Sequence, residues 1–156
     1  MQNVGLQDLT PSELRQAAAG DWAAVAALLT AATLPLDGAR EHLDHFVVAE
    51  RNGHIVGCAG IEPYGDAALL RSVAVAASER GQGTGQQLVA ASLARATDAG
   101  MTRVVLRTTS ADRFFARLGF ERISPDAAPD AVKASSQFNG VCSATAITMQ
   151  RTLLAR

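Results

Sequence analysis

The feature that most constrains this chain is a glycine-rich segment, RGQGTG at residues 80–85, between an apolar β-branched stretch and a helical pattern. Glycines at alternate positions let backbone N–H groups turn inward without Cβ clashes. Those N–H groups, with the positive end of the following helix, make a site for an anion. The segment therefore predicts a cradle for a pyrophosphate, formed by Arg80, Gly81, Gln82, Gly83, Thr84 and Gly85.

Two common nucleotide-binding patterns do not fit this segment. A dinucleotide fold requires G-x-G-x-x-G and an acidic residue about 20 positions on, but Gln86 stands at the third glycine and Met101 and Arg103 stand where the acid is expected. A P-loop requires Gly-Lys-Ser/Thr, and the single lysine, Lys133, lies in Val-Lys-Ala. The alternative, that this segment is a glycine-rich surface loop that binds no ligand, remains open at this point.

The composition is that of an ordinary globular protein. The 156 residues, 48% hydrophobic and 19% charged, fit one domain, which we place at residues 12–156 behind an N-terminal tail at 1–11. The 14 basic and 15 acidic residues leave no basic excess for nucleic-acid binding. The apolar runs are too short to span a membrane, and the start of the chain has no signal-peptide pattern. We expect a cytoplasmic protein.

Cysteine and histidine usage predicts neither a disulfide framework nor a metal site. Cys58 lies in an apolar stretch and is expected in the core, whereas Cys142 precedes the last strand, where it could lie near the site. The three histidines lack zinc-ligand spacing and are expected at the surface.

Hydrophobic periodicity predicts strands and helices in a mixed order. We expect strands at 12–18, 46–50, 54–61, 68–76, 102–109, 120–123 and 144–152. We expect helices after an N-cap at Asp21, at 38–44, from the glycine segment to about residue 99, and after a cap at Ser110, with a short helix or cover at 125–137. Asn52-Gly53 predicts a tight hairpin, and residues 63–66 predict a turn. This order indicates a single α/β domain with helices over a mixed sheet.

The glycine segment resembles the Arg-x-x-Gly-x-Gly/Ala signature of the GNAT N-acetyltransferase superfamily. Three further features follow in that family's order: Val-Ala-Val at 73–75, a strand at 103–109, and ADRFFARLGF at 111–120, which is similar to the family's Ala-x-x-Phe-Tyr-x-x-Leu-Gly-Phe helix. The resemblance covers about residues 12–152. It implies the GNAT acyl-CoA N-acyltransferase fold, a mixed and mostly antiparallel sheet with splayed central strands flanked by helices.

The same resemblance implies that acetyl-CoA is the co-substrate. Val73, Ala74 and Val75 would run beside the pantetheine arm, and the glycine segment would hold the pyrophosphate. A backbone N–H near Val73 would stabilise the oxyanion formed when an amine attacks the thioester directly. Members of the superfamily are often dimers, so a homodimer is an expectation.

Two residues depart from the family pattern. Phe115 stands where the family often has a tyrosine that protonates the departing thiolate, and Phe115 has no proton to donate. Thr108 stands where the family often has an asparagine, and its hydroxyl is a weaker hydrogen-bonding group.

The amine must lose a proton, so a general base or a chain of water molecules is required. Glu62, at the end of a predicted strand, is the first candidate, and Glu79, expected as an exposed loop charge, is the second. Arg71 lies on an apolar strand, where it either binds a substrate carboxylate or forms a structural ion pair. Tyr64 either lines the substrate mouth or is an ordinary turn residue.

Residues 45–50, 61–72, 134–138 and 142–144 resemble a narrower group, the small acetyltransferases of bacterial arsenic-resistance gene clusters. That group is similar to the acetyltransferase part of N-acetylglutamate synthases. The implied acceptor is a small amine, such as an amino acid or an amino-acid-like arsenical. A non-catalytic acyl-CoA-binding or sensing module on the same fold is the alternative, because Phe115 cannot act as an acid.

Overall fold

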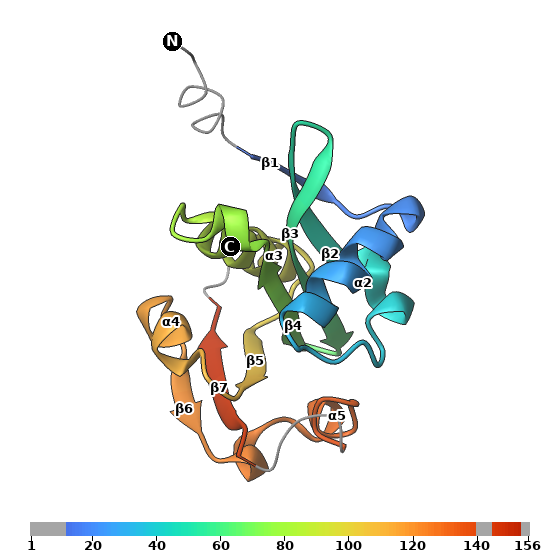
Figure 1. The fold of residues 1–156 in the computed structure, drawn as a ribbon. Helices are drawn as coiled ribbons and strands as arrows, with labels where there is room; N and C mark the ends of the chain where they lie inside the picture. Colours follow the sequence, from blue (N-terminus) through green and yellow to red (C-terminus); the bar gives the residue numbers. More distant parts are fainter. Residues whose placement is uncertain (1–11, 140–144, 154–156) are drawn as a thin grey trace.

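The computed structural model describes residues 12–139 and 145–153, and a seven-stranded sheet with the order β1-β2-β3-β4-β5-β7-β6 forms its centre (Figure 1). The strands are β1 (Glu13–Gln16), β2 (Phe46–Arg51), β3 (His54–Tyr64), β4 (Ala67–Val75), β5 (Arg103–Thr108), β6 (Glu121–Ile123) and β7 (Ile147–Thr152). The α-helices are α2 (Trp22–Ala31), α3 (Thr84–Asp98), α4 (Asp112–Arg117) and α5 (Asp130–Lys133). Short 3-10 helices are η1 (Ala19–Asp21), η2 (Arg40–His45), η3 (Ala77–Glu79) and η4 (Pro125–Ala127).

Alternation along the strands places helices on both faces of the sheet. Phe46 and Val48 of β2 pack in one core cluster with Leu29 of α2. Val47, between them in sequence, packs in a different cluster with Leu88 of α3. Because successive side chains of a strand point to opposite faces, α2 and α3 cover opposite sides of this half of the sheet.

The two central strands, β4 and β5, pair over a short segment, here called the seam, and then separate. The parallel strands β4 and β5 pair only over residues 67–69 and 103–105, although β4 continues to Val75 and β5 continues to Thr108. Beyond the seam β4 stays paired with β3, and β5 stays paired with β7. The expected fold, with splayed central strands, is confirmed.

A bulge lies in β4 where the strands part. Cys58 pairs with Ala74 and Gly60 pairs with Arg71, so β4 has one more residue than β3 over this interval. Ser72 inside the bulge has a φ of 61°, in the left-handed region that non-glycine residues rarely adopt. A bulge bends its strand and increases its local twist, which carries β4 away from β5.

The turns that glycine and asparagine predict from the sequence are present in the structure. Asn52 and Gly53 have φ values of 54° and 81°, as a tight hairpin between β2 and β3 demands. Gly100 follows α3 with a φ of 86°, the left-handed conformation that commonly ends a helix.

Two local predictions are wrong, and a third is confirmed in position but not in its hydrogen bond. Pro63 and Tyr64 extend β3 through pairs with β4, so the turn is confined to residues 65–66. Ser110 does not cap α4; the Thr108 hydroxyl accepts from the Ala111 N–H at 2.9 Å. Asp21 is the N-cap residue of α2, as predicted, but its side chain makes no capping hydrogen bond, because Arg15 and the Ala18 N–H bind its carboxylate.

Two further predictions concern residues that the structure does not describe. The predicted tail at 1–11 and Cys142 both lie outside the described residues. Within residues 12–139 and 145–153, no helix has the length and apolar character needed to cross a bilayer.

Replacing Gly60 with alanine should strongly destabilise the fold. A Cβ at Gly60 would lie 2.1 Å from Cε1 of the buried Phe46 ring, so the core would have to shift. Overpacking of this kind costs about 1–3 kcal/mol or more in free energy of unfolding. Urea unfolding followed by circular dichroism measures it.

The control for that variant is Gly20→Ala, where nothing lies within 4 Å of the added Cβ. Equal free energies of unfolding for the Gly60→Ala and Gly20→Ala proteins would contradict this account of the β2–β3 packing.

Candidate active site

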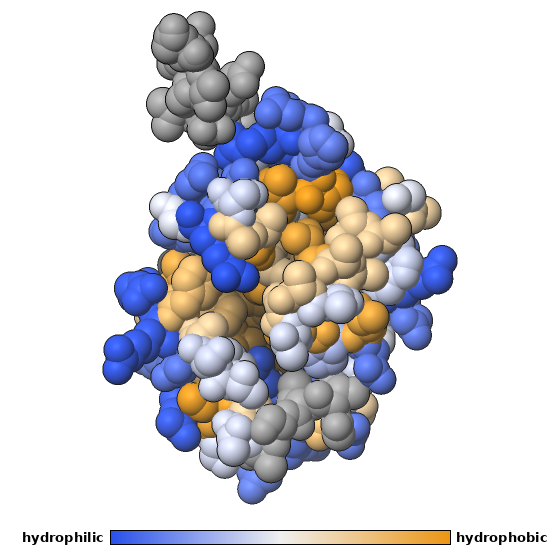
Figure 2. All heavy atoms as spheres, in the orientation of Figure 1, coloured by the Kyte–Doolittle hydropathy of each residue, from blue (hydrophilic) through white to orange (hydrophobic). Residues whose placement is uncertain are grey.

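A cleft of about 1460 Å³ occupies the region where β4 and β5 part. Its walls are the loop after α2, the bulge of β4, the glycine segment with the start of α3, the end of β5, and α4. Figure 2 shows this side of the molecule hollowed between its upper and lower parts, with hydrophobic and weakly polar residues around the hollow. The cleft is open, large and mostly apolar, which suits an extended ligand.

The glycine segment presents unused backbone donors to this cleft. Gly81 and Gly83 have φ values of 82° and 80°, and Gly83 is the residue before α3. In the part of the chain that the structure describes, no N–H group of residues 81–86 forms a hydrogen bond of good geometry to a carbonyl or side chain. The Arg80 N–H is used within the turn, where it donates to the Ala77 carbonyl at 3.4 Å. The donors of the predicted cradle are thus available, except that of Arg80.

The free edge of β4 is set by its pairing with β3. The Ala76 N–H donates to the Val56 carbonyl of β3 at 2.8 Å. Because the backbone groups of successive strand residues point to alternate edges, Ala74 shares this direction, and Val73 and Val75 point toward the gap. Val73 and Val75 both line the cleft, so an extended chain lying in the gap would meet their N–H and carbonyl groups.

Thr108 and Phe115 form part of the opposite wall. The Thr108 hydroxyl is engaged by the Ala111 N–H at the start of α4. The ring of Phe115 is 7% exposed and stacks edge-to-face on Phe114 and Phe120. The chain's one tyrosine, Tyr64, is not among the residues that line the cleft.

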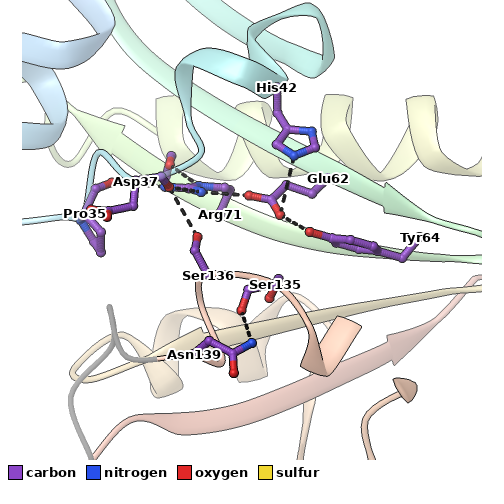
Figure 3. A network of polar contacts seen from close by, with 10 residues as sticks. Pro35, Asp37, His42, Glu62, Tyr64, Arg71, Ser135, Ser136 and Asn139 are labelled. Carbon is purple, nitrogen blue, oxygen red and sulfur yellow. Dashed lines mark hydrogen bonds and ion pairs between the residues drawn. The ribbon is translucent and has the colours of Figure 1, made fainter. Parts of the chain in front are cut away.

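Glu62 and Arg71 form a buried ion pair (Figure 3). Oε2 of Glu62 lies 2.7 Å from Nη1 of Arg71, and the two side chains are 2% and 0% exposed. The Tyr64 hydroxyl donates to the other oxygen, Oε1, and His42 Nε2 lies 3.8 Å from the same atom. Of the two interpretations of Arg71, the structure shows the ion pair.

The remaining donors of Arg71 hold the wall of the cleft. Nη1 also donates to the Asp37 carbonyl at 2.5 Å, and Nη2 donates to the Pro35 carbonyl at 3.1 Å. The Ser136 hydroxyl, approaching from beyond α5, donates to the same Asp37 carbonyl at 3.4 Å (Figure 3). Arg71 therefore connects the loop after α2 to the centre of the sheet.

Burial raises the pKa of two residues, Tyr64 and Cys58. Burial, together with the hydrogen bond to Glu62, raises the pKa of Tyr64 above its ordinary value. Burial also raises the pKa of the Cys58 thiol to about 12, and Cys58 lies in the core as expected. The Cys58 thiol donates to the Ser72 carbonyl at 3.3 Å, which helps to hold the bulge of β4.

Glu79 is not the exposed loop charge that the sequence predicts. Its side chain is 7% exposed, and Arg51 of β2 grips both of its oxygens at 2.9–3.1 Å. Although Glu79 lines the cleft, its carboxylate is committed to this pair. The pair anchors η3, and so the start of the glycine segment, to the β2–β3 hairpin.

Sequence reasoning missed the loop after α2 and Arg107. Asp37 is exposed and lines the cleft, and Thr33 has a φ of 59°, a costly conformation for a β-branched residue. No local motif marks that loop. Arg107 was detectable, because it is a charge in the apolar strand β5, the same signal that singled out Arg71.

Within the described residues, no group of three or more His, Cys, Asp or Glu side chains is placed to hold a metal ion.

Replacing Arg71 with methionine should destabilise the protein by about 3–5 kcal/mol, because it leaves the buried Glu62 carboxylate without its charge partner. The double variant Glu62→Gln/Arg71→Met should lose less than the sum of the two single variants. Urea unfolding of the four proteins measures this, with Arg122→Met, at an exposed position, as control. Strictly additive losses would contradict the pairing.

Comparison with known proteins agrees with this geometry. Residues 42–122 match the family model of the acetyltransferase (GNAT) domain. The amino-acid acetyltransferase of Neisseria meningitidis serogroup A is 29% identical over 136 residues, which cover 81% of this chain and 31% of that protein. This chain thus spans about a third of the length of that relative.

Two solved structures share the fold. The N-acetylglutamate synthase of Neisseria gonorrhoeae, complexed with coenzyme A and N-acetyl-glutamate, is 25% identical with a TM-score of 0.80, over 93% of this chain and 36% of that chain. Rv2747 from Mycobacterium tuberculosis, in complex with CoA, is 24% identical with a TM-score of 0.78, over 91% of this chain and 99% of that chain. With the family match over more than half of its length, this chain belongs to the GNAT acetyltransferase domain family.

Proposed function

We propose that this protein transfers the acetyl group of acetyl-CoA to the primary amine of an amino acid or an amino-acid-like small molecule. The observation that carries the proposal is the row of unused N–H groups at residues 81–86, at the start of α3 and beside the gap between β4 and β5. Such a row at a helix N-terminus binds phosphate groups well.

The parts of acetyl-CoA would lie along the cleft in order. The pyrophosphate would bind the N–H groups that begin at Gly81, with the exposed Arg80 side chain at the rim. The pantetheine arm would run along the free edge of β4 past Val75 and Val73. The thioester would then reach the bulge, where the Val73 N–H stabilises the oxyanion as the amine attacks.

The departing thiolate would leave without a protein acid. Phe115 stands at the position of that acid, and Tyr64 is held against Glu62 outside the cleft. A thiol has a pKa of roughly 8.5, so its thiolate is a tolerable leaving group near neutral pH.

The acceptor class rests on the relatives. The amino-acid acetyltransferase of Neisseria meningitidis acts, by its name, on amino acids, and the N-acetylglutamate synthase structure holds an acetylated amino acid. An amino acid is therefore the favoured acceptor here. An amino-acid-like arsenical, and with it a role in arsenic resistance, stays a prediction from the narrower sequence resemblance.

The experiment is a thiol-release assay with acetyl-CoA across a panel of amino acids, simple amines and an amino-acid-like arsenical. Mass spectrometry of the products identifies the acetylated amine. We expect turnover with at least one amino acid. Tight binding of acetyl-CoA by calorimetry with no amine-dependent release would contradict the proposal and favour the non-catalytic binding module.

The general base is tested by the pH dependence of kcat/KM. Glu62 remains the predicted base, although Arg71 and Tyr64 hold its carboxylate and Glu62, like Tyr64, is not among the residues that line the cleft. Asp37 is the exposed carboxylate that the structure adds at the cleft. We expect Glu62→Gln, but not Asp37→Asn, to lower kcat by about 100-fold and to remove the acidic limb of the profile. The reverse result would assign the base to Asp37, and an unchanged limb in both variants would leave proton transfer to water.

A further inference from the structure

Two arginines lie at matching positions on either side of the gap. Leu69 of β4 and Val105 of β5 form the last pair of the seam, and Arg71 and Arg107 follow two residues later on each strand. Because side chains alternate along a strand, each arginine shares the face of the residue two before it. Leu69 and Val105 pack in one cluster, so both arginines lie on the same face of the sheet, and both line the cleft.

Only one of the two is neutralised. Arg71 is fully buried and its donors reach Glu62, the Ser72 hydroxyl and two loop carbonyls. Arg107 forms no ion pair with any carboxylate of the described residues. Among the described residues, Arg107 is therefore the positive charge without a carboxylate partner that lies beside the gap, next to the place proposed for the thioester; Arg80 and Arg117, which also line the cleft, belong to the glycine segment and to α4.

Among the described residues, the guanidinium of Arg107 is held in place by two weak contacts. Its Cζ lies 4.9 Å from the centre of the Phe138 ring, and Nη1 donates to the Gln137 carbonyl at 3.3 Å. Its buried Nε has no hydrogen-bond partner within residues 12–139 and 145–153, and neither does the buried Oγ1 of Thr148, the residue opposite Arg107 in the ladder with β7. Unpartnered polar atoms at one spot point to a group that the described residues do not supply.

We propose that Arg107 binds the carboxylate of the acceptor and makes the enzyme prefer amino acids over other amines. This inference rests on the function proposed above. A guanidinium fork matches the geometry of a carboxylate, and stacking on the Phe138 ring fixes the plane of the fork. A carboxylate held there places its α-amine at the gap, where the thioester would lie, and Arg71 stays in its structural pair.

The test compares the best amino acid of the panel with its α-carboxamide, which has the same shape and no charge. In the wild-type protein, kcat/KM should favour the carboxylate by about 10- to 100-fold, the range that hydrogen bonds to charged groups give. In Arg107→Gln this preference should disappear, mainly through a higher KM for the amino acid. The KM for acetyl-CoA and the kcat/KM for the carboxamide should stay within about 3-fold of wild type.

Two further variants make the result specific. Arg107→Lys keeps the charge but lacks the fork, so it should restore only part of the preference and serves if the glutamine variant folds poorly. Arg122→Gln, at an exposed position of β6 outside the cleft, should behave as wild type. Turnover with an undiminished carboxylate preference in Arg107→Gln would overturn this inference and leave the proposed function standing. No turnover by the wild-type protein with any amine would overturn both.

Discussion

The parting of β4 from β5 is the constraint on which the rest of this structure depends. Seven strands paired without a break would leave no cleft, and the apolar centre of the sheet would be closed. Here the seam ends after Leu69 and Val105, and the bulge at Ser72 turns β4 away. The break exposes one backbone edge of β4 and one wall of β5, and the glycine segment lies at the far end of that edge. The proposed cofactor site and the proposed acceptor site are therefore consequences of one interruption in pairing.

The walls of this opening need fixed positions, and the Glu62–Arg71 pair fixes one of them, the loop after α2. A buried ion pair is weak evidence for net stability, because desolvation of both charges offsets their attraction. Its value here is geometric: the guanidinium reaches the carbonyls of Pro35 and Asp37 and sets where the loop after α2 lies. At the other end of the cleft, the Arg51–Glu79 pair anchors the chain before the glycine segment in the same way.

Features encoded locally could be predicted from the sequence, and features that depend on distant contacts could not. The Asn52-Gly53 hairpin and the glycine segment before α3 follow from the conformations that those residues allow. The fold itself was predicted from the family resemblance. The partner of Arg71 could not be assigned, because it depends on the β3–β4 register, and Arg51 lies 28 positions from Glu79. The Ala111 N–H donates to the Thr108 hydroxyl and not to Ser110. This choice depends on backbone angles that residue propensities do not distinguish, so it could not be predicted.

The central claim is that the free N–H groups at residues 81–86 hold the diphosphate of coenzyme A. Amide spectra of the ¹⁵N-labelled protein test this directly during titration with coenzyme A and, separately, with pantetheine, which lacks the diphosphate. The account predicts large shifts of the Gly81, Gly83 and Gly85 amides with coenzyme A and small ones with pantetheine. Saturation with coenzyme A that leaves these three amides unchanged, while other signals move, would contradict it.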